Sequence, residues 1–357
     1  MTIKVLIVDD SALVRRTITE TLSHDPAIEV VGVANDPLIA IEKIPRLQPD
    51  VITLDMEMPR MDGLTFLRLL QKERSSVAVL VISSLTQQGS KMALDAMDAG
   101  AMDVLAKPDG STSIGALGGK LAFHIKAAYA AKQRLRRLRQ IDAMPTSFPR
   151  HVVRPFVSSG QSKLGDPRLV VVGASTGGVE ALRALLPALP AGLPPILVVQ
   201  HIPAFFSKAV ADRLNALSDY EIREAVDDEP VLPGQCLMAP GNFHMLVTRS
   251  SGGYRTRLVQ SPPVHHCRPA VDLLFHSAAA AAGKHTLGVL LTGMGSDGAL
   301  GMQAIRNAGG TNLAEHEDSC IVYGMPRAAV QLGVVDKSVL LDHMPQAILD
   351  ALGRIST

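Results

Sequence analysis

Short, mostly apolar runs recur along this chain between stretches with a helical pattern. Runs that are apolar throughout, rather than alternating with polar residues, are typical of strands in a parallel sheet covered by helices on both faces. The runs form two separate series, so we predict an α/β fold of two doubly wound parallel-sheet domains. The first series is Val5–Val8, Glu29–Ala34, Val51–Leu54, Val77–Ile82 and Met102–Ala106, and the second includes Leu169–Val172, Ile196–Val199 and Thr286–Leu291.

The composition fits two packed domains and gives no electrostatic basis for a nucleic-acid or membrane partner. The 357 residues are 47% hydrophobic and 19% charged, with a net charge of +1. Such a chain can bury sizeable cores without presenting a strongly basic surface. No stretch approaches the roughly 18 apolar residues of a membrane span, and the N-terminal run does not read as a signal peptide. We expect a cytoplasmic monomer that binds no nucleic acid and is not inserted in a membrane.

The three cysteines lie far apart and form no C-x-x-C pair. We expect reduced, buried thiols of a cytosolic protein. One of them belongs to the run His265-His266-Cys267, which looks like a metal cluster. Adjacent residues rarely share one ion, so we interpret this run as a loop. The cysteines are Cys236, Cys267 and Cys320.

A basic stretch and a linker separate the two series. The segment from Gly118 to Ile141 holds seven lysines and arginines and no acid, and the residues after it are rich in Pro, Ser and Gly. The basic stretch fits the last helix of the first domain running into a solvated extension, with a docking surface for an acidic partner as the alternative. DNA binding is disfavoured because no helix-turn-helix unit follows.

Polar side chains end four strands of the first series. Asp9 and Asp10 follow the first run, Asp55 the third, Ser83 the fourth and Lys107 the fifth. The carboxyl ends of parallel strands share one crevice, so these side chains are expected to meet. Three carboxylates repel one another unless a cation joins them, and oxygen-only ligands suit Mg²⁺. With an ammonium and a hydroxyl beside the cation, this set is equipped to accept a phosphoryl group on a carboxylate.

This constellation resembles the receiver domain of bacterial response regulators over residues 1–125. Met56–Pro59 and Asp62-Gly63 match the loop that follows the acceptor in that family. Val104 is a departure, because many receivers carry there a Tyr or Phe that rotates on activation. The resemblance implies a phosphorylation site at Asp55, a Mg²⁺ site at Asp9, Asp10 and Asp55, and receiver-switch roles for Ser83 and Lys107.

The second series brings a serine, a histidine and an aspartate to the ends of three strands. Ser175 lies in GASTGG after the first run, His201 follows the second, and Asp297 follows the third. There His201 could take the proton of Ser175 while Asp297 holds the imidazole. The backbone N–H groups of Thr176 and Met294 are candidate oxyanion donors. The order Ser…His…Asp disfavours an ordinary α/β-hydrolase, in which the order is Ser…Asp…His.

Two other interpretations of GASTGG stay open on these residues alone. The segment could cradle a phosphate at a helix N-terminus, or it could be a purely structural turn. It lacks both G-x-G-x-x-G and G-K-[ST]. Gln200-His201 also stands where a dinucleotide fold needs an acid for the ribose. The last point argues against a nucleotide-binding oxidoreductase.

Five segments of the second series are similar to bacterial chemotaxis protein-glutamate methylesterases, in which a receiver is fused to a hydrolase: GASTGG, QHIP, LLTGMGSDG, APGNFHM and RPAVDLLF. Asn242 departs from that family, where an acid is common. The implied fold is a flavodoxin-like receiver at 1–125, a basic helical extension and linker at 126–165, and a Rossmann-like methylesterase domain at 166–357. The implied roles are nucleophile for Ser175, base for His201, its partner for Asp297, and oxyanion donors for the amides of Thr176 and Met294, with no cofactor in this domain.

The resemblance also implies a substrate, partners and regulation. The substrate is the γ-methyl ester of glutamate on the cytoplasmic helices of methyl-accepting chemoreceptors, with glutamine deamidation as a second activity. A chemotaxis histidine kinase would be the phosphodonor. The unphosphorylated receiver is expected to restrict the hydrolase, and phosphorylation to release it by a population shift. The alternative is a response regulator whose second domain is a non-catalytic binding platform.

Overall fold

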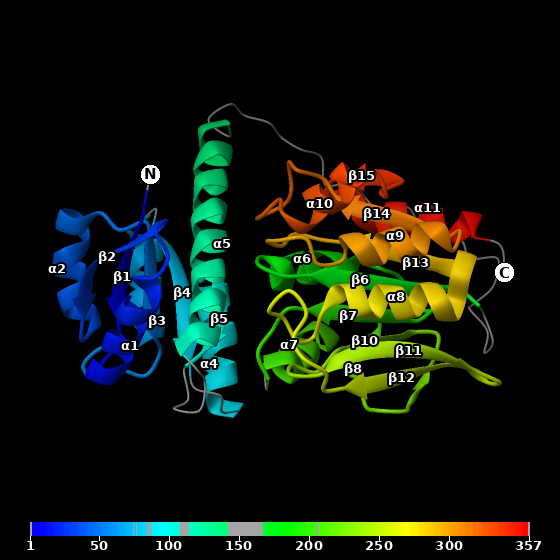
Figure 1. Cartoon of the computed structure of the whole chain (residues 1–357), viewed down its shortest axis with the longest axis horizontal. Coiled ribbons are helices and arrows are strands. Elements are labelled where there is room, and N and C mark those ends of the chain that lie inside the picture. The colour runs from blue at the N-terminus through cyan, green and yellow to red at the C-terminus, as the bar shows by residue number, and fades with distance from the viewer. Residues whose placement is uncertain are drawn as a thin grey trace. The chain divides into compact units, whose positions relative to one another are not determined.

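The computed structural model describes residues 2–73, 75, 77–83, 87–107, 114–141, 167–204 and 206–355, with the backbone alone at 87–90, 114–118 and 135–141. The chain divides into two compact units, Met1–Thr146 and Ser147–Thr357 (Figure 1). Of the predicted extension and linker at 126–165, the part from 142 to 165 lies outside the described residues.

The first unit is a parallel five-stranded sheet in the order β2-β1-β3-β4-β5. All five predicted strands are present, and the winding reverses between β1 and β3, which opens a crevice at their carboxyl ends. The strands are β1 (Ile3–Val8), β2 (Ile28–Ala34), β3 (Val51–Asp55), β4 (Ala78–Ser83) and β5 (Asp103–Ala106). The helices are α1 (Ala12–Leu22), α2 (Pro37–Leu47), α3 (Gly63–Lys72), α4 (Gln87–Asp98) and α5 (Ile114–Ile141).

Side-chain caps begin three of these helices directly after the strands. Ser11, Asp36 and Asp62 each accept a backbone N–H from the first turn of α1, α2 and α3 respectively. Such caps satisfy N–H groups that the helix itself cannot pair. These caps fix where the three helices begin.

Helix α5 carries the predicted basic stretch and runs without a break across position 125. Two of its lysines pair within the first unit: Lys126 Nζ lies 2.5 Å from Asp25, and Lys132 Nζ lies 2.8 Å from Asp50. These contacts favour the interpretation of this stretch as the last helix of the first domain. No helix in the described part of the chain is long and apolar enough to cross a membrane.

The second unit is built on a parallel seven-stranded sheet in the order β15-β14-β13-β6-β7-β10-β8. Its three central strands were predicted: β6 (Leu169–Ala174), β7 (Ile196–Gln200) and β13 (Thr286–Leu290). The winding reverses at β6, so β7 and β13 lie on either side of it. The other four strands are short or more polar: β8 (Glu221–Glu224), β10 (Gln235–Met238), β14 (Thr311–Glu315) and β15 (Lys337–Val339). The predicted class, two doubly wound α/β domains, is confirmed.

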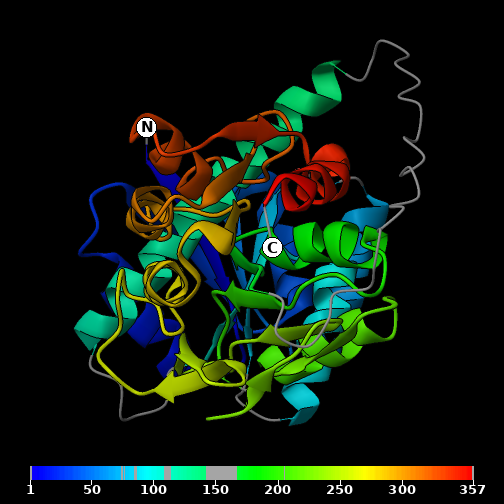
Figure 2. The same ribbon diagram turned by 90° about the vertical axis from the view of Figure 1, so that its right-hand side faces the viewer.

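Helices cover both faces of this sheet (Figure 2). One face carries α8 (Val271–Ala282) and α9 (Ala299–Asn307), with α10 (Met325–Gln331) against α9. The other face carries α6 (Gly178–Leu185), α7 (Phe206–Asn215) and α11 (Met344–Arg354). Three short 3₁₀ helices complete the set: η1 (Leu186–Ala188), η2 (Gly283–His285) and η3 (Leu341–His343).

A separate antiparallel sheet, which the sequence analysis did not predict, has the order β11-β12-β9. It consists of β9 (Pro230–Val231), β11 (His244–Ser250) and β12 (Gly253–Val259). Strand β11 packs on α8, where the N–H of Val247 donates to the hydroxyl of Ser277 at 3.0 Å. The small sheet thus supports the helix whose first turn, as shown below, belongs to the candidate site.

Helices α8 and α9 approach each other closely at Gly301. A Cβ at this position would lie 2.4 Å from the Cβ of Phe275, which is fully buried. The backbone of Asp272 is 3.2 Å from the same point. Only glycine allows this spacing, which sets how the first turns of α8 and α9 face each other.

We predict that Gly301→Ala lowers the free energy of unfolding of the second unit by about 1–3 kcal/mol, because the added methyl must displace Phe275 from a packed core. Gly353→Ala is the matched control, since a Cβ there meets nothing within 4 Å. It should raise the stability slightly, because alanine loses less entropy than glycine in a helix. Chemical denaturation of the full chain measures both, and a Gly301→Ala protein as stable as wild type would contradict the prediction.

Candidate functional site

Ser175 follows β6 on a turn with no room for larger side chains. Gly177, the N-cap of α6, has a φ of 77°, in the left-handed region. A Cβ on Gly173 would lie 2.3 Å from Cγ1 of Val271, the first residue of α8. A Cβ on Gly178 would lie 2.1 Å from Oε1 of Gln200. The glycines of GASTGG therefore allow a sharp strand-to-helix turn with the serine at its tip.

The structure brings Ser175, His201 and Asp297 into one hydrogen-bonded chain. Nδ1 of His201 lies 3.0 Å from Oγ of Ser175, and Nε2 lies 2.7 Å from Oδ2 of Asp297. The three residues follow β6, β7 and β13, which are neighbours where the winding reverses. Because Nε2 donates to the carboxylate, Nδ1 of the neutral ring carries the lone pair that can take the proton of Ser175.

Asp297 is held at the N-terminus of α8. Its Oδ2 accepts the N–H of Val271 and its Oδ1 that of Asp272, both at 2.8 Å. Burial raises the pKa of Asp297, but the hydrogen bond and charge of His201 and these two amides lower it further, so its pKa lies below the ordinary value. Asp297 is therefore ionised, which matches the positive end of the helix.

His201 has a pKa above its ordinary value. Burial lowers this pKa, while the sulfur of Cys267 and the carboxylate of Asp297 raise it by more. The site therefore favours the imidazolium, which is the form that His201 takes after it removes a proton from Ser175. His201 can take this proton only from its neutral form, the fraction of which grows as pH rises towards this pKa.

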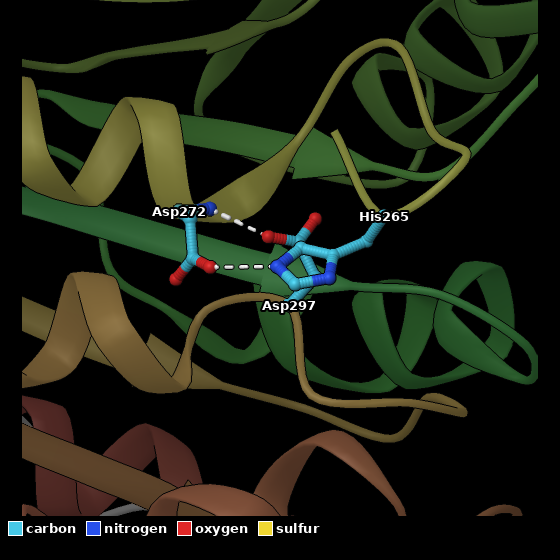
Figure 3. Close-up of side chains that lie close together, drawn as sticks. All are labelled: His265, Asp272 and Asp297. Atoms are coloured by element: carbon cyan, nitrogen blue, oxygen red, sulfur yellow. Dashed lines mark hydrogen bonds and ion pairs between the residues drawn. The ribbon is translucent and has the colours of Figure 1, made fainter. Parts of the chain in front are cut away.

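A second series of contacts continues from Asp297 through Asp272 to His265 (Figure 3). Nε2 of His265 lies 3.1 Å from Oδ2 of Asp272, and Oδ1 of Asp272 accepts the N–H groups of Gly298 and Gly301 at 2.9 and 2.7 Å. His265, Asp272 and Asp297 are close enough to share an ion. However, both carboxylates already accept amides at the positive ends of α8 and α9, where a cation is disfavoured. We interpret the group as a chain that orients Asp297.

Thr292 joins the turn of Ser175 to the loop after β13. Its carbonyl accepts the N–H of Ser175 at 3.0 Å, and its hydroxyl donates to the carbonyl of Thr176 at 3.0 Å. Its own N–H donates to the buried carboxylate of Glu315 at 2.8 Å. These bonds fix the backbone at Thr176 and the loop that leads to Met294. The amides of these two residues are the predicted oxyanion donors. The sequence analysis missed Thr292 and Glu315, because nothing in their spacing signals the contact.

The sequence analysis also missed two further residues that contact Ser175 or His201. Nε2 of Gln200 donates to the carbonyls of Ser175 and His201 at 2.9 and 3.1 Å, which fixes the backbone beside both. Sγ of Cys267 lies 3.4 Å from Nδ1 of His201. The expectation of buried thiols is right for Cys236 and wrong for Cys267, which is partly exposed. The run of three ligand-type residues that ends at Cys267 was the available signal.

Asn242, the departure from the family pattern, also has a defined contact. Its Oδ1 accepts from the guanidinium of Arg268, with Nε at 3.1 Å. Its backbone is in the left-handed region, with a φ of 71°, which asparagine tolerates better than most residues. A neutral acceptor therefore meets the guanidinium here instead of a carboxylate.

In the first unit, Asp9, Asp55 and Lys107 meet at the carboxyl end of the sheet. Nζ of Lys107 lies 2.6 Å from Asp55 and 3.7 Å from Asp9. Burial raises the pKa of Asp9 and of Asp55 by more than Lys107 lowers it. A carboxylate oxygen of each of Asp9, Asp10 and Asp55 lies within 4.8 Å of the others. This oxygen-only set, with two buried members, fits a Mg²⁺ ion that keeps several waters.

Ser83 ends β4 at the same edge of the sheet. Its hydroxyl is buried and makes no hydrogen bond to any described residue. Its carbonyl accepts the N–H of Lys107 at 2.8 Å, which ties the two strand ends together. A buried hydroxyl without a partner points to an acceptor that arrives from outside. Val104 is buried in β5 and offers no aromatic ring that could rotate.

Comparisons with known proteins show which family each unit matches. The sequence matches the CheB methylesterase family over residues 170–348 and the response regulator receiver domain family over residues 5–116. The catalytic domain of the CheB methylesterase of Thermotoga maritima has a solved structure with a TM-score of 0.51 and 38% identity, covering 51% of this chain and 97% of that chain.

Two relatives match over almost the whole chain. A protein-glutamate methylesterase/protein-glutamine glutaminase of Syntrophus aciditrophicus is 49% identical over 347 residues, covering 97% of this chain and 98% of its own. Its counterpart in Syntrophotalea carbinolica is 45% identical over 353 residues, covering 98% of each. The resemblance noted from the motifs is therefore confirmed. This chain belongs to the CheB methylesterase family, with a response regulator receiver domain ahead of its methylesterase domain.

Proposed function

We propose that this chain is a phosphorylation-regulated hydrolase that demethylates glutamate γ-methyl esters on chemoreceptors. The observation that carries the proposal is the unbroken chain from Ser175 through His201 to Asp297, with contacts of 3.0 and 2.7 Å. It occurs in a family whose relatives are named protein-glutamate methylesterase/protein-glutamine glutaminase. The second half of that name supports deamidation of receptor glutamines at the same site.

In the proposed reaction, Nδ1 of His201 takes the proton of Ser175 while Oγ attacks the ester carbonyl. Asp297, which is ionised, holds the imidazolium through Nε2. The N–H groups of Thr176 and Met294 stabilise the oxyanion. His201 then gives its proton to the departing methoxide, which leaves as methanol. A water molecule then attacks the acyl-enzyme while His201 takes its proton, and His201 passes that proton to Oγ of Ser175 as glutamate leaves. With glutamine as substrate, the first leaving group is ammonia.

For the first unit we propose Asp55 as the phosphorylation site. Asp9, Asp10 and Asp55 would hold Mg²⁺, whose charge offsets that of the arriving phosphoryl group. Lys107, already 2.6 Å from Asp55, would bind a phosphoryl oxygen. The hydroxyl of Ser83, which has no hydrogen-bond partner among the described residues, would donate to another phosphoryl oxygen. The phosphodonor would be a chemotaxis histidine kinase, and the phosphorylated receiver would shift the hydrolase towards its active population.

We predict that Ser175→Ala lowers methanol release from methyl-labelled chemoreceptor membranes by about 10³-fold or more, because no other group replaces the nucleophile. Ser338→Ala is the control, since this serine is exposed on β15. Retained release in Ser175→Ala would show that the nucleophile is misassigned. No release from wild type would instead favour the non-catalytic binding platform.

We predict that Asp55→Asn abolishes uptake of a phosphoryl group from a small phosphodonor with Mg²⁺, because the amide cannot form the acyl phosphate. The same variant should lose the rise in methanol release that the donor produces in wild type. Glu73→Gln, at an exposed residue that ends α3, makes the same change of charge and should behave as wild type. Phosphoryl uptake measured by intact-protein mass spectrometry decides the point, and uptake by Asp55→Asn would refute the assignment.

A further inference from the structure

Cys267 lies against the same nitrogen of His201 that faces Ser175. Its Sγ is 3.4 Å from Nδ1, while Oγ of Ser175 is 3.0 Å from that atom. Nε2 of the ring is committed to Asp297 at 2.7 Å. The neutral ring therefore has one lone pair, at Nδ1, for two donors. The hydroxyl and the thiol compete for it.

A tight hairpin brings the thiol to this place. Val264 and Cys267 exchange both backbone hydrogen bonds, at 3.0 and 2.8 Å. The two residues between them, His265 and His266, have φ values of 49° and 63°. A two-residue turn with positive φ at both positions usually contains Asn-Gly, and larger residues adopt it at a cost in free energy. The contact of His265 with Asp272, at 3.1 Å, anchors the turn.

We propose that Cys267 is a positioning residue of this hydrolase, which shares Nδ1 of His201 with Ser175 and holds the imidazole between the two. The inference rests on the proposed role of His201 as the base. When His201 carries the proton of Ser175, the sulfur is a second acceptor for Nδ1–H and keeps the ring in place. When His201 is neutral, the thiol occupies Nδ1 for part of the time. His201 then also activates the thiol, because the thiolate is its reactive form.

Within the described residues, three groups face His201, each from a different element: Ser175 from the turn before α6, Cys267 from the hairpin, and Asp297 from the loop after β13. The charge of Asp297 in turn acts to raise the pKa of Asp272 and of His244. Of the hydrogen bonds among the described residues, those at Nδ1 come from Cys267 and Ser175. Removal of either one should therefore alter how His201 serves the other.

The test is the rate at which iodoacetamide labels Cys267 in the full-length chain, followed by mass spectrometry of its peptide. The thiolate attacks the methylene carbon, the carbon–iodine bond breaks, iodide leaves, and His201 keeps the thiol proton. Ser175→Ala should speed labelling several-fold, because the competitor for Nδ1 is gone. His201→Gln should slow it several-fold, because the base is gone. The buried thiols of Cys236 and Cys320 should stay unlabelled in each protein, which shows that each variant is folded.

Equal labelling rates in the three folded proteins, or slower labelling in Ser175→Ala, would overturn the proposal. This readout does not depend on esterase activity. Absence of methanol release from wild type would therefore count against the proposed function alone, and the labelling pattern would still decide the role of Cys267.

A pH profile gives a second readout that a purely structural role would not move. The charge and the hydrogen bond of Cys267 raise the pKa of His201, and activity needs the neutral ring, so activity rises as pH rises through this pKa. Cys267→Ala lowers the pKa and should move the acidic limb of kcat/KM to lower pH. Cys267→Ser, which keeps an acceptor at the same place, should lie between this variant and wild type. An acidic limb that stays unchanged in Cys267→Ala would overturn the proposal.

Discussion

The hydrogen bond between Nε2 of His201 and Asp297 is the contact on which the second site depends. It determines which ring nitrogen faces Ser175, and it requires an ionised carboxylate that is only 1% exposed. An unpaired charge in such a place costs several kcal/mol. The two amides at the start of α8 offset this cost, since a hydrogen bond to a charged group contributes about 1.5–3 kcal/mol. The close packing of α8 on α9 and β11 therefore helps to hold the two amides that bind Asp297.

Both proposed sites lie where the winding of the sheet reverses, and both bury carboxylates whose charge needs a favourable partner. The first unit uses an ammonium, that of Lys107 beside Asp55. The second uses helix N-termini, with α8 serving Asp297 and α9 serving Asp272. The difference has a chemical consequence. An ammonium beside Asp55 supplies positive charge for an arriving phosphoryl group, whereas a carboxylate fixed by backbone amides keeps a single orientation for the imidazole.

The sequence predicts all five strands of the first sheet, but only the three central strands of the second. Central strands such as β6 are buried on both faces, so they are recognisable as apolar runs. The parallel topology then places the residues at their carboxyl ends at one edge of the sheet. Edge strands such as β8 and β15 are too polar or too short to stand out. The contacts that support the site could not be predicted for another reason. Thr292 and Asp272 act through backbone groups of distant residues, and Cys267 reaches His201 only because of the hairpin turn, which neither spacing nor residue type encodes.

The ring state of His201 tests the central claim most directly. Nitrogen-15 NMR of histidine-labelled protein, with His201 assigned from the signal lost in His201→Gln, reports which nitrogen carries the proton of the neutral ring. The spectrum is recorded at high pH, because the pKa of His201 is raised. The account predicts a proton on Nε2, hydrogen-bonded to Asp297, and an unprotonated Nδ1 facing Ser175 and Cys267. A neutral ring protonated at Nδ1 would contradict it, because such a ring could not take the proton of Ser175.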